Sequence, residues 1–154
     1  MIWAIRTLLW FAALTVGLVA LATWLPPYLN RVQVPPDYEG IGGLVPMTGV
    51  WLTAPPYRVG DVLAYRFGDG PEDISFAFIA ALPGNSVRIV ADELLVDDHE
   101  VSNWKESGTY RGFHDVGPLT VPVNHYYVIS KDHQHDSVAL GVIGPDQIFG
   151  KVRE

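Results

Sequence analysis

The stretch Ile74-Ser75-Phe76-Ala77-Phe78-Ile79-Ala80-Ala81-Leu82-Pro83-Gly84-Asn85-Ser86-Val87 decides the fold of this chain. Its first part is almost entirely apolar and has the length of a buried strand of about eight residues. Pro83-Gly84-Asn85 is a turn signal, because proline and glycine favour backbone angles at which a strand does not continue. A second apolar run starts at Val87. The stretch therefore predicts two consecutive strands joined by a tight turn.

Short apolar runs of the same kind occur on both sides of this stretch, separated by glycine, proline, asparagine and aspartate. Such runs predict strands, and no helical period of useful length occurs after residue 30. The predicted fold class is therefore mainly β, with a barrel-like domain. The predicted strands are residues 50–52, 61–67, 76–82, 87–90, 93–96, 119–123, 126–130 and 147–152.

Residues 1–30 have a different character from the rest of the chain. No charge occurs between Arg6 and Arg31, and the uncharged run of residues 7–25 is long enough for a helix to cross a hydrocarbon core of about 30 Å. Aromatic residues lie toward the ends of the run, as they do at membrane interfaces. We therefore predict a retained transmembrane anchor over residues 1–30. The alternative is a signal peptide with the small-x-small cleavage pattern Ala20-Leu21-Ala22.

Two further parts of the chain follow the predicted anchor. Residues 31–43 contain paired prolines and several glycines, which indicate an extended, mobile linker that ends in closely packed backbone. Residues 44–154 then form the β domain. The predicted localisation is the cell membrane, crossed once, with the β domain on the outer, periplasmic side.

The composition excludes several classes of function. The chain has 154 residues, 49% of them hydrophobic, which is enough for one core. Its net charge of -7 argues against a nucleic-acid surface, which needs a basic stripe. Cysteine is absent, so the chain has neither a disulfide framework nor a thiolate zinc site. The predicted partners are membrane lipid and a protein, and no cofactor is predicted.

The end of the deciding stretch, Ala80-Ala81-Leu82-Pro83-Gly84-Asn85, resembles a signature box of the signal peptidase I clan of serine/lysine membrane peptidases. In that box a strand runs Lys-Arg-apolar-apolar-Gly/Ala-Leu-Pro-Gly-Asp, and the lysine is the catalytic base. On this pattern the lysine falls on Ala77 and the arginine on Phe78. The scaffold of the box is present, whereas its two basic residues are replaced.

Three other boxes of the clan have similar stretches here, in the same order. Residues 44–63 resemble the first box, Ser-apolar-Pro, most closely in the variant of the pilin-processing peptidases of conjugative transfer. Residues 92–101 resemble the short hairpin, and residues 123–152 resemble the last box. The resemblance covers residues 44–152 and implies a signal-peptidase-like β-barrel domain behind one N-terminal transmembrane helix.

The resemblance also implies which positions would carry catalysis. Clan catalysis needs a serine hydroxyl activated by a neutral lysine, and a second hydroxyl holds that lysine. These three positions fall on Leu44, Ala77 and Gln134. The first serine of the chain is Ser75, so no register of the first box contains a serine nucleophile. We therefore predict a catalytically inactive protein.

Two neighbouring positions also depart from the clan. Val138 stands where an arginine would pair with Asp136, and the region of the oxyanion hole reads Gly42-Gly43 without a hydroxyl. The alternative hypothesis is an active endopeptidase with an unassigned nucleophile. Its candidate residues are Thr48, Ser75 and Lys131.

The predicted role is a binding or structural subunit of a membrane complex. A former substrate groove can take an extended peptide as an added strand, and apolar replacements would make its floor less polar. The residues predicted to line this partner-binding groove are Leu44, Pro46, Val50 and Ala77.

A third hypothesis is a metal-binding periplasmic subunit. Asp132, His133, His135 and Asp136 lie within one short segment, and imidazole and carboxylate groups bind zinc, nickel or copper. His125 or His114 would serve as a further ligand. Because a turn-rich loop also needs polar residues, the metal site is an alternative and not the main prediction.

Overall fold

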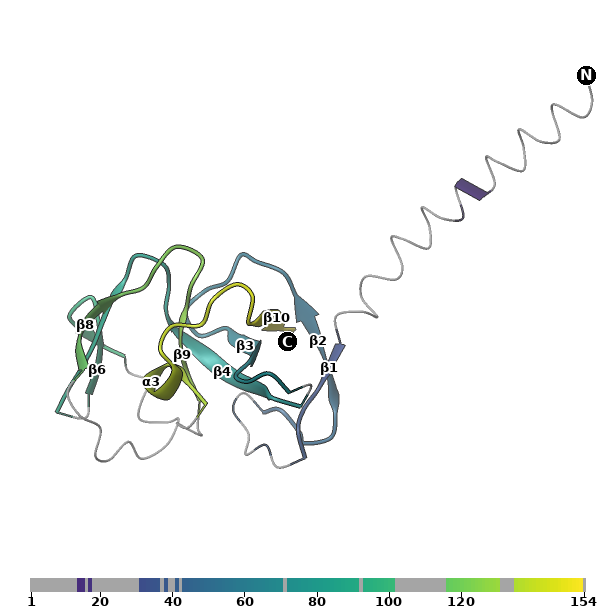
Figure 1. Ribbon diagram of the computed structural model, residues 1–154, viewed down its shortest axis with the longest axis horizontal. Coiled ribbons are helices and arrows are strands. Elements are labelled where there is room, and N and C mark those ends of the chain that lie inside the picture. The colour runs from purple at the N-terminus through teal and green to yellow at the C-terminus, as the bar shows by residue number, and fades with distance from the viewer. Residues whose placement is uncertain are drawn as a thin grey trace, which may run out of the picture.

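The structure is a computed structural model of the chain (Figure 1). It describes residues 14, 15, 17, 31–36, 38, 41, 43–70, 72–91, 93–101, 116–130 and 135–153. The predicted transmembrane anchor lies almost wholly outside these residues. Within the described part of the chain, no helix is long and apolar enough to cross a membrane.

The strands form two antiparallel sheets (Figure 1). The larger sheet has six strands in the order β1 (Arg31–Gln33), β2 (Gly49–Thr53), β10 (Ile148–Val152), β3 (Val62–Arg66), β4 (Ile74–Ala81) and β9 (Tyr127–Ile129). The smaller sheet has four strands in the order β7 (His99–Glu100), β6 (Glu93–Val96), β5 (Ser86–Val90) and β8 (Val116–Thr120). A short helix, α3 (Ser137–Leu140), lies between β9 and β10 in the sequence.

The mainly β prediction is confirmed, and each of the eight predicted strands overlaps an observed one. The prediction of a barrel-like domain is matched only in part. The described strands form two sheets, and the edge strands of the larger sheet, β1 and β9, do not pair with each other. Among the described elements, β1 and α3 had no sequence prediction, whereas β7 lies in residues 92–101, which resemble the short hairpin of the clan.

The deciding stretch forms β4, a turn and β5, and it joins the two sheets. The turn is closed by the side chain of Asn85, whose Oδ1 accepts a hydrogen bond of 2.8 Å from the backbone N–H of Leu82. Gly84 has a φ of 90°, a left-handed value that suits glycine. Its N–H donates to the carbonyl of Val121 over 2.9 Å. The turn is thus anchored to a distant segment, which places β5 in the second sheet.

The core of the six-stranded sheet has two faces. Side chains alternate along a strand, so Phe76 and Ala77 of β4 point to opposite sides. The Ala77 face consists of Leu63, Tyr65, Ala77, Ile79, Val128 and Ile143. The Leu44 face consists of Val34, Leu52, Ala64 and Phe76, with the partly buried residues Leu44, Val50, Val62, Ile74, Val152, Val32 and Tyr38 packed against them.

The stretch predicted as a linker, residues 31–43, packs on this sheet where it is described. Arg31–Gln33 form β1, paired with β2, and Val34 is fully buried in the Leu44 face. Tyr38 makes an edge-to-face contact with Phe76 at 5.4 Å between ring centroids. Its hydroxyl also donates to the Phe76 carbonyl over 3.3 Å. The described residues of this segment therefore pack as part of the folded domain and cover one face of the sheet.

Candidate functional site

The two positions that the resemblance assigns to nucleophile and base lie on opposite faces of the six-stranded sheet. Leu44 is half-buried and packs against the Leu44 face. Ala77 is 0% exposed and belongs to the Ala77 face. The register of β3 and β4 pairs Leu63 with Ala77 and Ala64 with Phe76, which fixes this parity. The sheet therefore separates the two positions.

The surroundings of Ala77 are apolar. The partly buried residues packed against the Ala77 face are Tyr57, Phe67, Leu82, Tyr126 and Ile148. Tyr57 and Tyr126 contact each other edge to face, with 5.3 Å between ring centroids. Burial raises the pKa of Tyr57, and the nearby Tyr126 raises it further. The predicted burial of Ala77 is confirmed, and its predicted place on a partner-binding surface is wrong, because no part of it reaches solvent.

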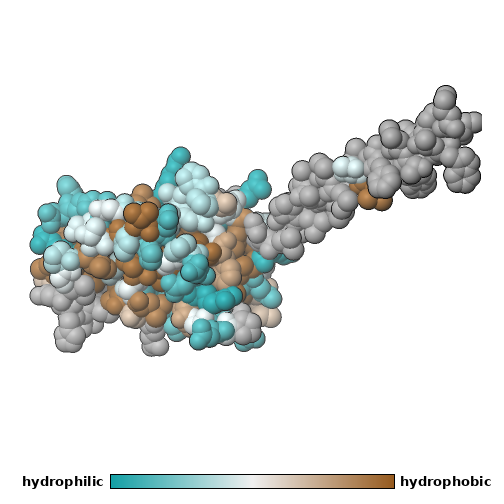
Figure 2. Space-filling view, turned by 45° about the horizontal axis from the view of Figure 1, so that its top comes forward, coloured by the Kyte–Doolittle hydropathy of each residue, from teal (hydrophilic) through white to brown (hydrophobic). Residues whose placement is uncertain are grey.

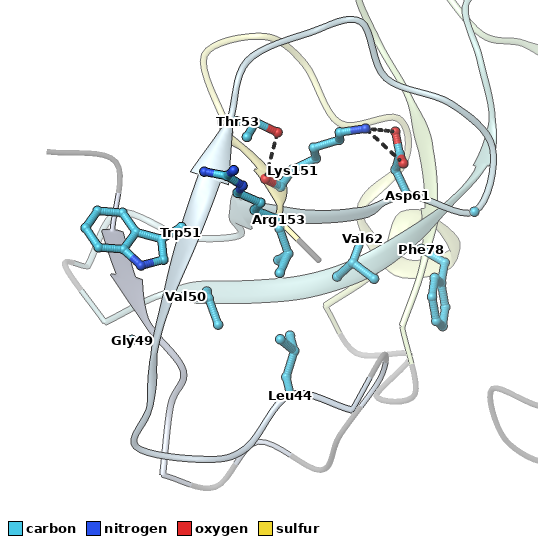
Figure 3. Close-up of a pocket in the computed structure, with 12 residues that line it drawn as sticks. Leu44, Gly49, Val50, Trp51, Thr53, Asp61, Val62, Phe78, Lys151 and Arg153 are labelled. Carbon is cyan, nitrogen blue, oxygen red and sulfur yellow. Dashed lines mark hydrogen bonds and ion pairs between the residues drawn. The ribbon is translucent and has the colours of Figure 1, made fainter. Parts of the chain in front are cut away.

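Leu44 instead borders a cavity of about 590 Å³ (Figure 3). This volume is within the range of about 300–1,000 Å³ that is typical of ligand sites. We call this cavity the Leu44 pocket. Of the groove residues predicted from the sequence, Leu44 and Val50 line it, whereas Pro46 is exposed in the preceding turn and does not. Its lining is Leu44, Gly49, Val50, Trp51, Thr53, Gly60, Asp61, Val62, Phe78, Lys151, Val152 and Arg153.

The polar residues of the pocket come from β2, from the turn before β3, from β10 and from the residue that follows β10. The Lys151 ammonium contacts both carboxylate oxygens of Asp61, at 3.1 and 3.2 Å. The two side chains are 29% and 21% exposed, so the pair is only partly screened by water. The hydroxyl of Thr53 donates to the carbonyl of Lys151 over 3.4 Å, and the N–H of Arg153 donates to the carbonyl of Trp51 over 2.9 Å.

Sequence reasoning missed this ion pair and the polar half of the pocket. Asp61 and Lys151 are 90 residues apart. They lie in the first and the last of the matching boxes, and neither box indicates a contact with the other. A β10 strand placed between β2 and β3 brings them together. The available signal was an aspartate in the turn before one strand and a single lysine in the final strand. These two residues can be paired only when the order of the strands in the sheet is known.

The residues considered as an alternative nucleophile or base have structural roles where they are described. The Thr48 hydroxyl donates to the carbonyl of Val45 over 2.5 Å within an exposed turn. Ser75 is 8% exposed in β4, opposite Tyr65 in the β3–β4 register. Lys131 and Gln134 lie outside the described residues. The described part of the chain thus contains one lysine, Lys151, and Asp61 already binds it.

The Asp136-Ser137 pair, which matches the last box, stabilises the loop after β9. Asp136 is fully buried and caps α3, with Oδ1 accepting from the Val138 N–H over 2.9 Å. Its other oxygen accepts from the Ser130 N–H over 3.1 Å. The Ser137 hydroxyl oxygen accepts from the Val128 N–H over 2.8 Å. Both side chains therefore hold the loop against β9, as their burial requires.

The metal hypothesis concerns the same loop and is only partly covered by the structure. Asp132, His133 and His114 lie outside the described residues. His135 stacks on Phe67 with 4.0 Å between ring centroids, and its carbonyl accepts a hydrogen bond from the Tyr65 hydroxyl. In the described part of the chain no three histidine or acidic side chains gather as metal ligands would. The buried carboxylate of Asp136 is used by backbone N–H groups.

Comparisons with known proteins agree with the fold. One solved structure similar to this chain is the crystal structure of a signal peptidase I from Enterococcus faecalis V583, with a TM-score of 0.50 and 17% sequence identity. The similarity covers 66% of this chain and 100% of that chain, and at this identity it concerns the fold alone. A search of curated proteins finds no match. The family model described as "Signal peptidase, peptidase S26" matches residues 6–154. The chain therefore belongs to the signal peptidase S26 family.

Proposed function

We propose that this chain is a catalytically inactive member of its family, and that it binds a protein partner of a membrane complex through the Leu44 pocket. The family is one of serine peptidases that use a serine and a lysine in direct contact. The observation that carries the proposal is the placement of Leu44 and Ala77 on opposite faces of the sheet, with Ala77 fully buried. Neither side chain has a group that attacks, donates or accepts a proton.

The remaining polar groups support the same conclusion. A lysine acts as a general base only when it is neutral and close to its nucleophile. Lys151 instead contacts both carboxylate oxygens of Asp61, so its ammonium group is engaged in an ion pair. The hydroxyl next to it, that of Thr53, donates to a backbone carbonyl. This arrangement suits a fixed binding surface better than a nucleophile.

The binding role is supported by the shape and chemistry of the pocket. Exposed apolar residues such as Val45, Met47 and Val59 occur at several places on the β domain, between polar ones (Figure 2). Scattered apolar residues of this kind are common and do not mark a binding site by themselves. The Leu44 pocket differs from them, because it is concave and gathers apolar side chains beside a few polar groups.

The experiment compares proteins that co-purify with the full-length chain from membranes in mild detergent. Leu44→Asp places an unpaired carboxylate in the pocket and is expected to release the partner. Val45→Asp is the matched control, because Val45 is the exposed neighbour and does not line the pocket. Both variants should keep the circular dichroism spectrum of the parent. A partner retained by Leu44→Asp, or released equally by Val45→Asp, would exclude the pocket as the binding site.

We also propose that the chain is attached to the cell membrane by residues 7–25, with the β domain on the outer side. The support is the uncharged run of residues between Arg6 and Arg31, together with a family of membrane peptidases. Protease added to intact spheroplasts should digest the β domain, since it would be accessible from outside. A β domain that is protected until the cells are lysed would reverse this orientation.

A further inference from the structure

The Leu44 pocket has two parts of different chemistry. Leu44, Val50, Val62 and Phe78 gather in one part, on the Leu44 face of the sheet. Asp61, Lys151, Arg153 and Thr53 gather in the other part, where Lys151 pairs with Leu63 of the opposite face (Figure 3). An entirely apolar segment would fill only the first part and would cover the charges of the second without pairing them. Because burying an unpaired charge is costly, the best occupant carries an apolar group and a charged group side by side.

The charge of the pocket is opposite to that of the whole chain. The chain has a net charge of -7, whereas the pocket contains two cationic side chains and one carboxylate. Lys151 and Asp61 pair with each other at 3.1 Å. The Arg153 side chain makes no ion pair with another described residue. The pocket therefore has one excess positive charge in an acidic protein, which favours an anionic group.

A second guanidinium is held at the rim of the pocket. Arg31 pairs with Trp51 in the β1–β2 register, and its guanidinium carbon lies 5.7 Å from the centre of the Trp51 ring. Gly49 leaves the space that this guanidinium occupies, because a Cβ at Gly49 would collide with it. On the other side of Trp51, the Arg153 backbone bonds to the Trp51 carbonyl. Arg31 of β1 and Arg153, the residue after β10, thus lie on either side of Trp51 in β2.

We infer that the Leu44 pocket recognises an extended peptide segment in which an aliphatic side chain lies next to an aspartate or glutamate. The aliphatic side chain enters the part lined by Leu44, and the carboxylate binds the guanidinium of Arg153, with Arg31 at the rim. Guanidinium groups bind carboxylates through two parallel hydrogen bonds, which gives both affinity and orientation. This inference rests on the proposed function and adds the chemical class of the partner segment.

The test measures binding of two short fluorescent peptides to the full-length chain in nonionic detergent at low salt. Both peptides alternate valine and threonine around a central leucine, and both have blocked termini so that no terminal carboxylate is present. One has aspartate after the leucine and the other has lysine. Fluorescence anisotropy should show that the aspartate peptide binds about tenfold more tightly, which is the effect of one good charged hydrogen bond.

Three variants locate the source of this preference. Arg153→Gln should bring the two affinities close together, and Gly49→Ala should reduce the difference by displacing the Arg31 guanidinium. Arg66→Gln is the control, because Arg66 is exposed, lies over the ring of Phe149 and does not line the pocket. It should leave the tenfold preference unchanged.

The outcomes separate the inference from the proposed function. If Leu44→Asp abolishes binding of both peptides while Arg153→Gln leaves their ratio unchanged, the pocket binds peptides and the acidic preference is wrong. If the parent chain binds neither peptide, the pocket does not take an extended segment and both ideas are overturned. An aspartate preference that is lost in Arg153→Gln and kept in Arg66→Gln supports the inference.

Discussion

The two faces of the six-stranded sheet differ most at the positions where the resemblance locates the catalytic pair. On the Ala77 face the position of the base is sealed inside an apolar cluster. On the Leu44 face the position of the nucleophile borders a cavity, whose charged residue Lys151 pairs with Leu63 of the opposite face. The comparison teaches that the two positions differ in access. One is closed within the core, and the other borders the Leu44 pocket.

The largest expected effect is on the Ala77 face. Ala77→Lys would place an ammonium group among Leu63, Tyr65 and Ile79, inside an apolar cluster. We expect it to lower the free energy of unfolding by more than about 3 kcal/mol, the scale of an uncompensated buried charge. Urea unfolding followed by circular dichroism measures this change. Ala54→Lys, on an exposed loop residue, is the control and should have little effect.

Failure of this first prediction would contradict the difference in access between the two faces of the sheet. An Ala77→Lys variant as stable as the parent would mean that the lysine reaches solvent or a partner group. In that case position 77 would be accessible, and the two faces would not differ in the way described.

A smaller effect is expected on the Leu44 face, where Tyr38 covers Phe76. Tyr38→Ala removes an edge-to-face aromatic contact and a hydrogen bond to the Phe76 carbonyl. Because Tyr38 is only half-buried, we expect a loss of about 2 kcal/mol, below the range for a fully buried aromatic residue. Tyr38→Phe keeps the ring and should cost about 1 kcal/mol or less. Equal losses for the two variants would mean that the ring does not cover the sheet.

The smallest effect is a pH dependence on the alkaline side. Burial raises the pKa of Tyr38 to about 12, against a partly offsetting hydrogen bond from the Ile41 N–H. Since the folded state holds the proton more tightly than the unfolded state, stability is fully present below pH 10 and falls as the pH rises toward about 12. Burial also raises the pKa of Tyr127, so part of this loss should remain in Tyr38→Phe. Chemical unfolding across this pH range should show a shallower decline for Tyr38→Phe, and an identical decline would contradict the assignment.

Much of the fold could be predicted from the sequence because most strands have a local signature. The run from Ile74 to Leu82 is apolar enough, and its turn specific enough, to identify β4 and β5 without tertiary information. β1 could not be identified, since Arg-Val-Gln has one apolar residue and is a strand only through its pairing with β2. Helix α3 is four residues long and depends on the Asp136 cap, which a periodicity cannot reveal.

The candidate site was only half predictable for a related reason. The resemblance assigned the nucleophile and base positions to Leu44 and Ala77, but sequence order does not say which face of a sheet a loop residue contacts. That depends on the parity of the β3–β4 register, which pairs Leu63 with Ala77. The pairing of Lys151 with Asp61 likewise depends on β10 lying beside β3. The order of strands that are distant in sequence thus determines which residues meet at the candidate site, and the motifs do not contain this information.

The measurement that tests the central claim most directly is cleavage of a signal-peptide-bearing preprotein by the purified full-length chain. The chain is used in excess over the substrate, so that even a single slow turnover would be detected by gel or mass spectrometry, and an active signal peptidase serves as the positive control. The proposed inactivity predicts no cleavage above the protein-free control. Saturable cleavage that remains proportional to the amount of the chain through repeated purification would contradict the account.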